Sequence, residues 1–330
     1  MSSSLISIII PVYNGENTIG HCLDSIFQSI YKDFECIVID DHSSDNTLDI
    51  VKGYNAKLVQ SDKQQGASYA RNQGAETAKG DILLFIDSDV TIYPDTLGKV
   101  IDAFDGNPQI SALFGSYDDN PWHTNFLSQY RNLFHHFIHQ TSHENASTFW
   151  TGFGAVKKDT FFKAGKFDEN CRMMEDIELG YKLKAQNCDI LLVKDIVVKH
   201  YKCYTFFSLL KSDFFDRAIP WTVLMLKNKE NTSDLNFKIS HKLSAAVVMV
   251  LLLFILISII NFWAIPAVLV LLLLYLALNL DVYQFYFQKR GLLFSLKVIP
   301  LHILYYVYSS IGFVAGTLKY YIDNLSKTEK

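Results

Sequence analysis

The stretch Ile82-Leu83-Leu84-Phe85-Ile86-Asp87-Ser88-Asp89 decides the fold of this 330-residue chain. Its first five residues are all apolar and large, which is typical of a strand buried on both faces of a parallel sheet. Two carboxylates follow at once, separated by a single serine. Ligands of such sheets bind beyond the carboxyl ends of the strands, and Mg²⁺ and Mn²⁺ prefer oxygen ligands. The stretch therefore predicts a divalent cation at the end of a buried strand.

Similar apolar runs recur in the first part of the chain and alternate with helical patterns. We expect strands at 5–13, 35–40, 57–60, 81–86 and 110–115, and helices at 18–29, 47–54, 67–78 and 94–104. This alternation predicts βαβ units and an α/β domain with a mostly parallel central sheet. Further on, 149–157 and 190–199 read as strands and 175–186 as a helix, whereas 116–147 shows no regular pattern.

Two more groups of polar residues fall where a ligand of this sheet would bind. Asp40 and Asp41 end the second predicted strand, and their carboxylates could accept from a nucleobase N–H or from ribose hydroxyls. Gly66 opens a predicted helix that carries Arg71, whose planar guanidinium could reach a phosphate. The alternative for the first group is a turn followed by a helix cap at Ser44 or Asp45. The alternative for the second is a solvated or ion-paired Arg71.

A third acidic pair, Glu175-Asp176, begins the helix predicted at 175–186. Either the helix dipole favours carboxylates there, or one of them takes a proton from an attacking hydroxyl as a general base. His200 closes the following strand and could complete a metal shell, contact an acceptor or serve the structure alone. His135, His139 and His143 could present one helix face to zinc, although such faces are more often solvated.

The hydrophobic residues are concentrated towards the C-terminus. The run 243–280 contains no Asp, Glu, Lys or Arg, and one membrane span needs about 20 apolar residues. We expect spans at 243–260, 262–280 and 298–318. Basic residues between the second and third spans (Lys289, Arg290 and Lys297) place that loop, and with it the catalytic domain, on the cytoplasmic face of an integral membrane protein. A third full span would place the C-terminal tail outside the cytoplasm, which the same rule opposes. The third segment could therefore be tilted or re-entrant.

The stretch 206–226 places aromatic and charged residues at helical spacing. It indicates an amphipathic segment at the membrane surface, or else an ordinary packed helix. The expected organisation is therefore a catalytic domain over 1–204, an interfacial segment and linker over 205–242, a membrane region over 243–322 and a polar tail over 323–330.

The composition of the chain further restricts its binding partners and the state of its cysteines. The net charge of −4 argues against a nucleic-acid partner, which usually demands a basic domain. The five cysteines are odd in number and lack C-x-x-C spacing, which favours reduced thiols. The N-terminal residues lack a basic region before their apolar run, so they read as a strand and not as a signal peptide.

Taken in order, these motifs resemble those of the family 2 inverting glycosyltransferases of GT-A fold. The resemblance covers about residues 5–200. It is carried by Ile8-Ile9-Ile10-Pro11-Val12-Tyr13-Asn14, by 40–47, by Gly66 with Ala70-Arg71-Asn72, by Asp87-Ser88-Asp89, by 165–169 and by Glu175-Asp176. The C-terminal spans resemble those of members that glycosylate lipids or lipid-linked acceptors.

The resemblance implies a role for each matching residue. The nucleotide-sugar donor would be bound by Pro11, Val12, Tyr13, Asp41, Arg71, Asp87 and Ser88, of which the first four cradle the nucleoside. Asp89 would bind Mg²⁺ or Mn²⁺, and Asp176 would be the catalytic base. Glu175, His200, Arg217 and Trp221 are the expected contacts to the acceptor or to a phosphate.

The expected reaction is metal-assisted displacement of a sugar from its nucleotide to a membrane lipid or lipid-linked acceptor. A polyprenyl phosphate is an alternative acceptor. A processive polysaccharide synthase is a second alternative, but the Q-x-x-R-W motif of such enzymes is incomplete here, because Asp213 stands four residues before Arg217 and Trp221 follows. A protein that binds nucleotide-sugars without turnover is the rival from another class.

Overall fold

The computed structural model describes residues 4–171, 173–228 and 239–328. These residues divide into two compact units, each of which is considered by itself. The first unit runs to Thr124 and resumes over His139–Cys203. The second contains Asn125–Ile138 and everything after Tyr204. It thus takes in one segment, 125–138, that lies inside the predicted 1–204 domain. Part of the predicted linker (229–238) and the last two residues of the tail fall outside the described residues.

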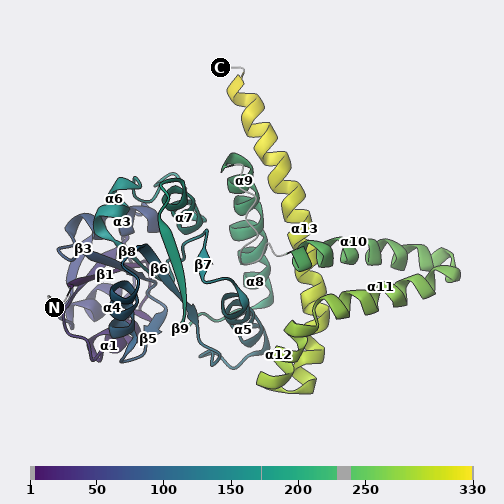
Figure 1. Ribbon diagram of the computed structural model, residues 1–330, viewed down its shortest axis with the longest axis horizontal. Coiled ribbons are helices and arrows are strands. Elements are labelled where there is room, and N and C mark those ends of the chain that lie inside the picture. The colour runs from purple at the N-terminus through teal and green to yellow at the C-terminus, as the bar shows by residue number, and fades with distance from the viewer. Residues whose placement is uncertain (1–3, 172, 229–238, 329–330) are drawn as a thin grey trace. The chain divides into compact units, whose positions relative to one another are not determined.

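The first unit is built on one twisted sheet (Figure 1). Strands β1 (Ile6–Val12), β2 (Phe34–Asp40), β3 (Lys57–Gln60) and β4 (Ile82–Ile86) pair in parallel, in the order β3-β2-β1-β4. The register sets Val12 opposite Asp40, so the chain leaves β1 and β2 at the same edge. All five residues of β4 are buried, as the opening stretch predicts.

The sheet continues through β8 (Phe153–Lys157), β6 (Ile110–Tyr117), β9 (Asp189–His200) and β5 (Val90–Ile92), and β7 (Asn145–Ala146) pairs with β9. Strand β8 is antiparallel to both β4 and β6, so β6 and β9 return to the direction of β4. Six strands therefore run one way, and the predicted α/β class with a mostly parallel sheet is confirmed.

Helices cover both faces of this sheet because strand residues point alternately to either side. Ile8 and Ile10 of β1 pack with one set of helices, and Ile9 packs with the other. The first set is α1 (Ile19–Phe27), α2 (Thr47–Lys52) and α4 (Thr96–Gly106). The second set is α3 (Ala67–Thr77), α6 (Lys158–Lys163) and α7 (Glu175–Ala185).

The stretch 116–147 is more regular than its sequence indicates, because it contains helix α5 (Phe126–Thr141). The helix is hard to recognise because histidines and polar residues are interleaved with its apolar face. That face, formed by Tyr130, Leu133, Phe134 and Ile138, is buried in the core of the second unit. The helix is thus stabilised by packing against distant segments and not by local pattern.

The second unit is helical. It contains α8 (Phe206–Asp213), a π-helical turn (Phe214–Ala218), α9 (Ile219–Asn228), α10 (Ile239–Ile260), a short 3-10 turn (Phe262–Ala264), α11 (Ile265–Leu278), α12 (Leu280–Arg290) and α13 (Leu292–Thr328). Pro220 lies in the first turn of α9, where a missing N–H is tolerated. Among the described residues, α10 and the part of α13 from Leu292 to Leu325 are each long and apolar enough to cross a membrane.

The second and third predicted spans differ from the observed helices. The helix predicted over 262–280 ends at Leu278, and α12 follows at an angle of 65°, so this pair is either a broken span or a re-entrant loop. Asn279 occupies the break and is buried, donating to Ser244 Oγ (2.9 Å) and accepting from the hydroxyl of Tyr306 (2.9 Å). A re-entrant arrangement, which we considered for the third segment, is thus one of two alternatives for the second. Helix α13 begins before 298 and continues through Pro300.

Candidate active site

Asp41 fixes the edge of the sheet where β1 and β2 end. Its N–H donates to the carbonyl of Val12 (2.8 Å), and its two carboxylate oxygens accept from the N–H groups of Gln65 (2.8 Å) and Gly66 (2.7 Å). Gly66 has φ of +97°, a conformation that favours glycine, so the turn into α3 needs this residue. Asp41 therefore positions the start of α3, and its predicted contact to a nucleoside stays a prediction.

The loops that follow β1 and β2 are tied together by hydrogen bonds. Asn14, at φ of 49°, accepts from the N–H of Ser44 (2.9 Å) and donates its own N–H to Ser43 Oγ (2.8 Å). Beside these bonds the ring of Tyr13 is 47% exposed, whereas Val12 is buried. The predicted nucleoside contacts thus form an ordered rim with one aromatic ring open to solvent.

Arg71 joins two of the acidic motifs. It lies on α3, is 4% exposed, and forms ion pairs of 2.7 Å with Asp87 and of 2.7 Å with Glu175. Burial alone would lower the pKa of Arg71, but the two carboxylates outweigh it and raise that pKa above its usual value. Its Nε is buried without a partner among the described atoms. The structure therefore shows Arg71 as an ion-paired residue. Its Nε–H is a hydrogen-bond donor that these two ion pairs leave unused.

The two aspartates after β4 have different partners. Burial raises the pKa of Asp87 above its usual range and Asp89 adds to this, although Arg71 opposes it. Burial would also raise the pKa of Asp89, but His200 outweighs it and lowers that pKa. The Nε2 atom of His200 lies 3.4 Å from Asp89 Oδ2, and its ring stacks on Tyr117 at 4.2 Å. The structure thus brings the side chains of Asp89 and His200 together, and their joint role in a metal shell stays a prediction.

The side chains of Asp89 and His200 can supply part of the ligand atoms that a hard divalent cation needs. The Oδ2 atom of Asp89 and the Nε2 atom of His200 lie 3.4 Å apart. This distance is longer than a good hydrogen bond. It is close to the separation of roughly 3 Å between neighbouring ligand atoms of one octahedral ion. The part of the chain that the structure describes holds no group of three or more His, Cys, Asp or Glu gathered for one ion. Magnesium-type sites commonly obtain their other ligands from substrate phosphates and water.

Asp176 is held beside this arrangement by the loop before β8. Its carboxylate accepts from the N–H of Ile177 (2.8 Å) and lies 3.5 Å from the N–H of Thr151. The carbonyl oxygen of the next loop residue, Gly152, lies 3.5 Å from the backbone nitrogen of Asp87. Burial, with a contribution from Glu175, raises the pKa of Asp176 to about 7. A carboxylate with such a pKa is suited to general base catalysis near neutral pH.

Gly180 sets the position of Asp176. It lies one turn further along α7, and a Cβ there would come within 2.5 Å of the backbone nitrogen of Phe149. Helix α7 therefore packs directly on the backbone before β8, which aligns its first turn with the loop at Thr151. Within that turn Glu175 is bound to Arg71, which leaves Asp176 as the better candidate for a base.

Arg217 and Trp221 belong to the second unit and are described apart from the acidic residues. Asp213, which is buried, lies 2.9 Å from Arg131 and 3.5 Å from Arg217, and it accepts from the hydroxyl of Tyr308 (2.6 Å). Sequence reasoning missed Arg131. The only signal for it is a lone arginine among the aromatic residues of α5. Two guanidinium groups thus face one carboxylate, which leaves this cluster with an excess of positive charge.

His139 has a structural role in the first unit. Its Nδ1 lies 3.1 Å from the carbonyl of Gly115, and its ring packs edge-on against Trp150 at 5.2 Å. These contacts place the imidazole in the core and not on a solvated helix face.

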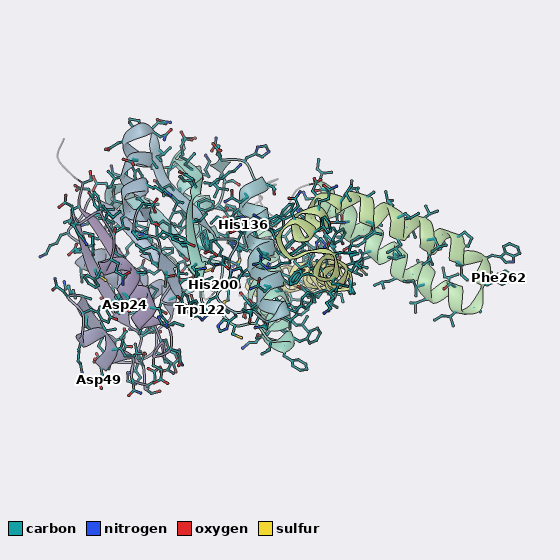
Figure 2. All side chains as sticks on the ribbon, turned by 90° about the horizontal axis from the view of Figure 1, so that it is seen from below. Asp24, Asp49, Trp122, His136, His200 and Phe262 are labelled. Carbon is teal, nitrogen blue, oxygen red and sulfur yellow. The ribbon has the colours of Figure 1, made fainter. Side chains whose placement is uncertain are left out.

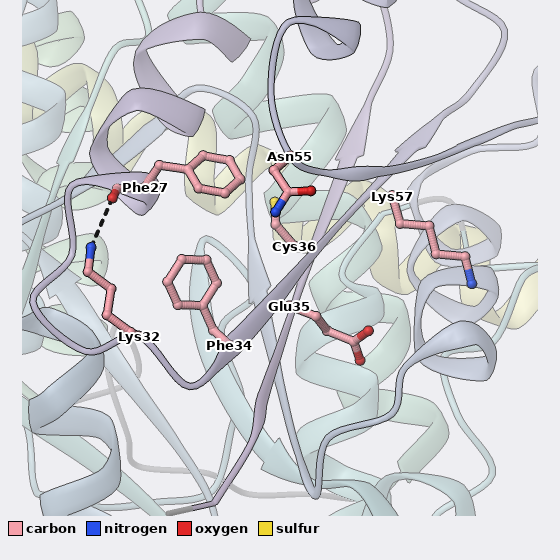
Figure 3. Close-up of a pocket in the computed structure, with 7 residues that line it drawn as sticks. All are labelled: Phe27, Lys32, Phe34, Glu35, Cys36, Asn55 and Lys57. Carbon is pink, nitrogen blue, oxygen red and sulfur yellow. Dashed lines mark hydrogen bonds between the residues drawn. The ribbon is translucent and has the colours of Figure 1, made fainter.

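A hollow of about 400 Å³ lies away from these residues (Figure 3). It is lined by Phe27, Lys32, Phe34, Glu35, Cys36, Asn55 and Lys57. Phe34 and Lys57 begin β2 and β3, so the hollow lies at the amino ends of these strands. The acidic residues lie at the opposite, carboxyl ends, where ligands of parallel sheets bind.

Comparisons with known proteins agree with this geometry. Residues 7–167 match the sequence profile of the family described as "Glycosyl transferase family 2". The chain is 29% identical over 192 residues to an uncharacterized glycosyltransferase of Haemophilus influenzae, covering 54% of this chain and 62% of that protein. It is 36% identical over 121 residues to the Escherichia coli UDP-Glc:alpha-D-GlcNAc-diphosphoundecaprenol beta-1,3-glucosyltransferase, covering 36% and 47%. The matched stretch thus spans about half the length of these curated relatives.

Solved structures share the fold. A mannosyltransferase from Pyrobaculum calidifontis in complex with GDP-Man and Mn²⁺ aligns with a TM-score of 0.61 at 16% identity, covering 94% of this chain and 86% of that one. S. aureus TarS 1–349 in complex with UDP-GlcNAc aligns with a TM-score of 0.52 at 21% identity, covering 67% and 66%. At these identities the likeness shows the fold alone. The GT-A fold expected from the motifs is confirmed.

Proposed function

Residues 7–167 form a family 2 glycosyltransferase domain, and we propose that the protein transfers a sugar from a nucleotide-sugar donor to a lipid-linked acceptor with inversion at the anomeric carbon. The observation that carries this proposal is the joining of two acidic motifs, Asp87-Ser88-Asp89 and Glu175-Asp176, at one edge of the sheet. Arg71 bridges Asp87 and Glu175, and one short loop contacts both Asp87 and Asp176.

The donor binds along the carboxyl ends of β1, β2 and β4 in this proposal. Tyr13 stacks on the base, while Pro11, Val12 and Asp41 enclose the nucleoside. Ser88 and Asp87 contact the sugar and the ribose side of the diphosphate, and the free Nε of Arg71 points to a role with a phosphate oxygen. Because Arg71 is already held by two carboxylates, it is pre-organised and loses little freedom on binding.

Asp89, with His200 beside it, would hold Mg²⁺ or Mn²⁺. When bound, the ion supplies positive charge that stabilises the departing nucleotide diphosphate. The E. coli relative is named for a UDP-sugar and the P. calidifontis neighbour was solved with GDP-Man and Mn²⁺, which supports a nucleotide-sugar and a divalent cation without selecting either.

Asp176 acts as the base in the proposed reaction. Its carboxylate takes the proton from the acceptor hydroxyl as that oxygen attacks the anomeric carbon on the face opposite the diphosphate. A carboxylate whose pKa is about 7 is partly ionised at neutral pH and holds the proton more firmly than an ordinary aspartate. Glu175 positions Arg71 and takes no part in the proton transfer.

The helical unit supports a membrane acceptor. Helices α10 and α13 are apolar along most of their length, and only 17% and 28% of their most apolar windows are buried within the protein. We propose that they anchor the catalytic unit on the cytoplasmic face, as the basic residues Lys289 and Arg290 in the last turn of α12 favour. Arg217, held by Asp213 with an excess of positive charge, would face an anionic phosphate of the lipid, and Trp221 would lie in the interface.

A polyprenyl phosphate is the second candidate acceptor, because the same charge excess around Asp213 would suit its headgroup. An anionic phosphate oxygen needs no base. Loss of the Asp176 carboxylate would then cost much less than loss of Asp89. A processive synthase fits less well, since Asp213 binds Arg131 and Arg217 as part of a buried cluster.

Membranes carrying the protein, incubated with labelled UDP-, GDP- and dTDP-sugars, test the proposal. We expect label from one donor class to enter the chloroform-soluble lipid extract, with a requirement for Mg²⁺ or Mn²⁺. Label that appears only in water-soluble product would contradict the lipid acceptor, and binding of donor without any transfer would contradict the enzyme itself.

A further inference from the structure

An exposed tryptophan lies beside the candidate active site on a stack of aromatic rings. Trp122, in the segment between β6 and α5, is 52% exposed, yet its ring stacks on Tyr201 with centroids 4.5 Å apart. The imidazole of His21 stacks on Tyr201 at 5.1 Å and lies 5.9 Å from the indole. Figure 2 labels Trp122 and His200 in this part of the first unit. The indole is therefore supported from within and open to solvent on its other side.

Backbone contacts connect this stack to the predicted metal residue. The N–H of Tyr201 donates to the carbonyl of Asp89 (2.8 Å). His200, the residue before Tyr201, approaches the Asp89 carboxylate. The imidazole of His123 bonds to the carbonyl of Tyr201 (2.9 Å), which fixes the segment that carries Trp122. The indole is thus held at a set position relative to Asp89.

The surroundings of Trp122 are polar, unlike a bilayer-facing surface. Asp118 accepts from the hydroxyl of Tyr93 (2.6 Å) and pairs with Lys199 (3.0 Å), and the exposed Asn120 donates its N–H to the same carboxylate (3.1 Å). By contrast, the exposed residues of α10 are mostly aliphatic, as contact with lipid requires. The segment that carries the indole also contains the exposed polar residues Asn120 and Thr124. An exposed aromatic face with polar neighbours suits a sugar ring, whose C–H groups face the π-system while its hydroxyls bond to polar groups.

We propose that Trp122, supported by Tyr201, is the platform on which the acceptor's terminal sugar ring stacks. This inference rests on the proposed function and makes it more specific, because the acceptor then carries a sugar and is not a bare polyprenyl phosphate. Trp122 becomes a specificity-determining residue that orients the acceptor hydroxyl and takes no part in bond making.

The platform is tested by measuring steady-state KM and kcat in detergent for the transfer of labelled glucose from UDP-glucose. Two acceptors are compared. These are GlcNAc-diphosphoundecaprenol and undecaprenyl phosphate. With the first, Trp122→Ala should raise KM roughly tenfold, the loss of one aromatic stacking contact, while kcat changes less. Trp122→Phe should recover most of the loss, because it restores an aromatic face. The matched control is Phe162→Ala, an exposed aromatic on α6 of the same unit, which should leave KM unchanged.

The outcomes separate this inference from the proposed function. Wild-type transfer with an unchanged KM in Trp122→Ala would overturn the platform alone. Transfer to undecaprenyl phosphate and not to the sugar-bearing lipid would overturn the platform and favour the second candidate acceptor. Reduced binding of Trp122→Ala to phospholipid vesicles, with KM unaltered, would identify the indole as a bilayer contact and also overturn it. Failure of the wild type to transfer sugar from any UDP-, GDP- or dTDP-sugar to either lipid would overturn the proposed function and this inference with it.

Discussion

At the scale of single residues, the site works by distributing charge among neighbouring carboxylates. Arg71 forms ion pairs with both Asp87 and Glu175, so the carboxylates of these two residues are already engaged. Burial, with a contribution from Glu175, raises the pKa of Asp176, and the opposing effect of Arg71 is smaller. Sequence alone groups all four residues in candidate motifs. It cannot tell which carboxylate is left to act as a base, because that depends on which of them the buried guanidinium reaches.

The pH dependence of the reaction follows from this arrangement. The pKa of Asp176 is raised to about 7, so the carboxylate is protonated and inactive as a base below that pH and becomes available above it. With a hydroxyl acceptor, the logarithm of kcat/KM should rise with a slope near one up to about pH 7 and then level off. Rates measured in buffers of constant ionic strength would show this. A profile that stays flat well below neutral pH would mean that Asp176 is not the base.

At the scale of elements, close packing of α7 on the backbone before β8 holds Asp176 in place. Gly180→Ala would push a methyl group against the backbone nitrogen of Phe149, so the helix must shift, at a cost of about 1–3 kcal/mol. We expect a lower midpoint of thermal unfolding and a loss of transfer activity. Gly98→Ala is the matched control: it lies in α4 with no atom within 4 Å of the added Cβ, and it should be neutral or stabilising. Equal effects of the two changes would refute the packing argument.

The elements also show where sequence reasoning succeeds and where it stops. Strands β1 to β4 are predicted closely because each is a short apolar run that ends in polar residues. Helix α5 is missed because its apolar face, with Leu133 and Phe134, is covered by segments far away in the sequence. The break at Asn279 is missed for a related reason. A single asparagine in an apolar run carries no local stop signal, and its partners Ser244 and Tyr306 come from other helices.

At the scale of the whole molecule, a catalytic unit with polar chemistry is joined to a helical unit with apolar surfaces. The helices α10 and α11 form a hairpin whose tip carries Phe262 (Figure 2), and the side chains along it are largely exposed. Water is a poor solvent for such a surface, whereas a bilayer covers it. In the function proposed above, the apolar helices would keep the sugar-transferring unit at a bilayer surface, where a lipid-linked acceptor could reach it.

In the reaction we propose, Asp176 activates a hydroxyl of a lipid-linked acceptor. The most direct test is the initial rate at which labelled sugar enters the lipid extract of membranes carrying Asp176→Asn, compared at about pH 8 with wild type and with Asp89→Asn. The account predicts that Asp176→Asn loses at least about 100-fold in rate, the usual contribution of a general base, with a loss of similar severity in Asp89→Asn. A mild loss in Asp176→Asn beside a severe loss in Asp89→Asn would contradict it and favour a phosphate acceptor.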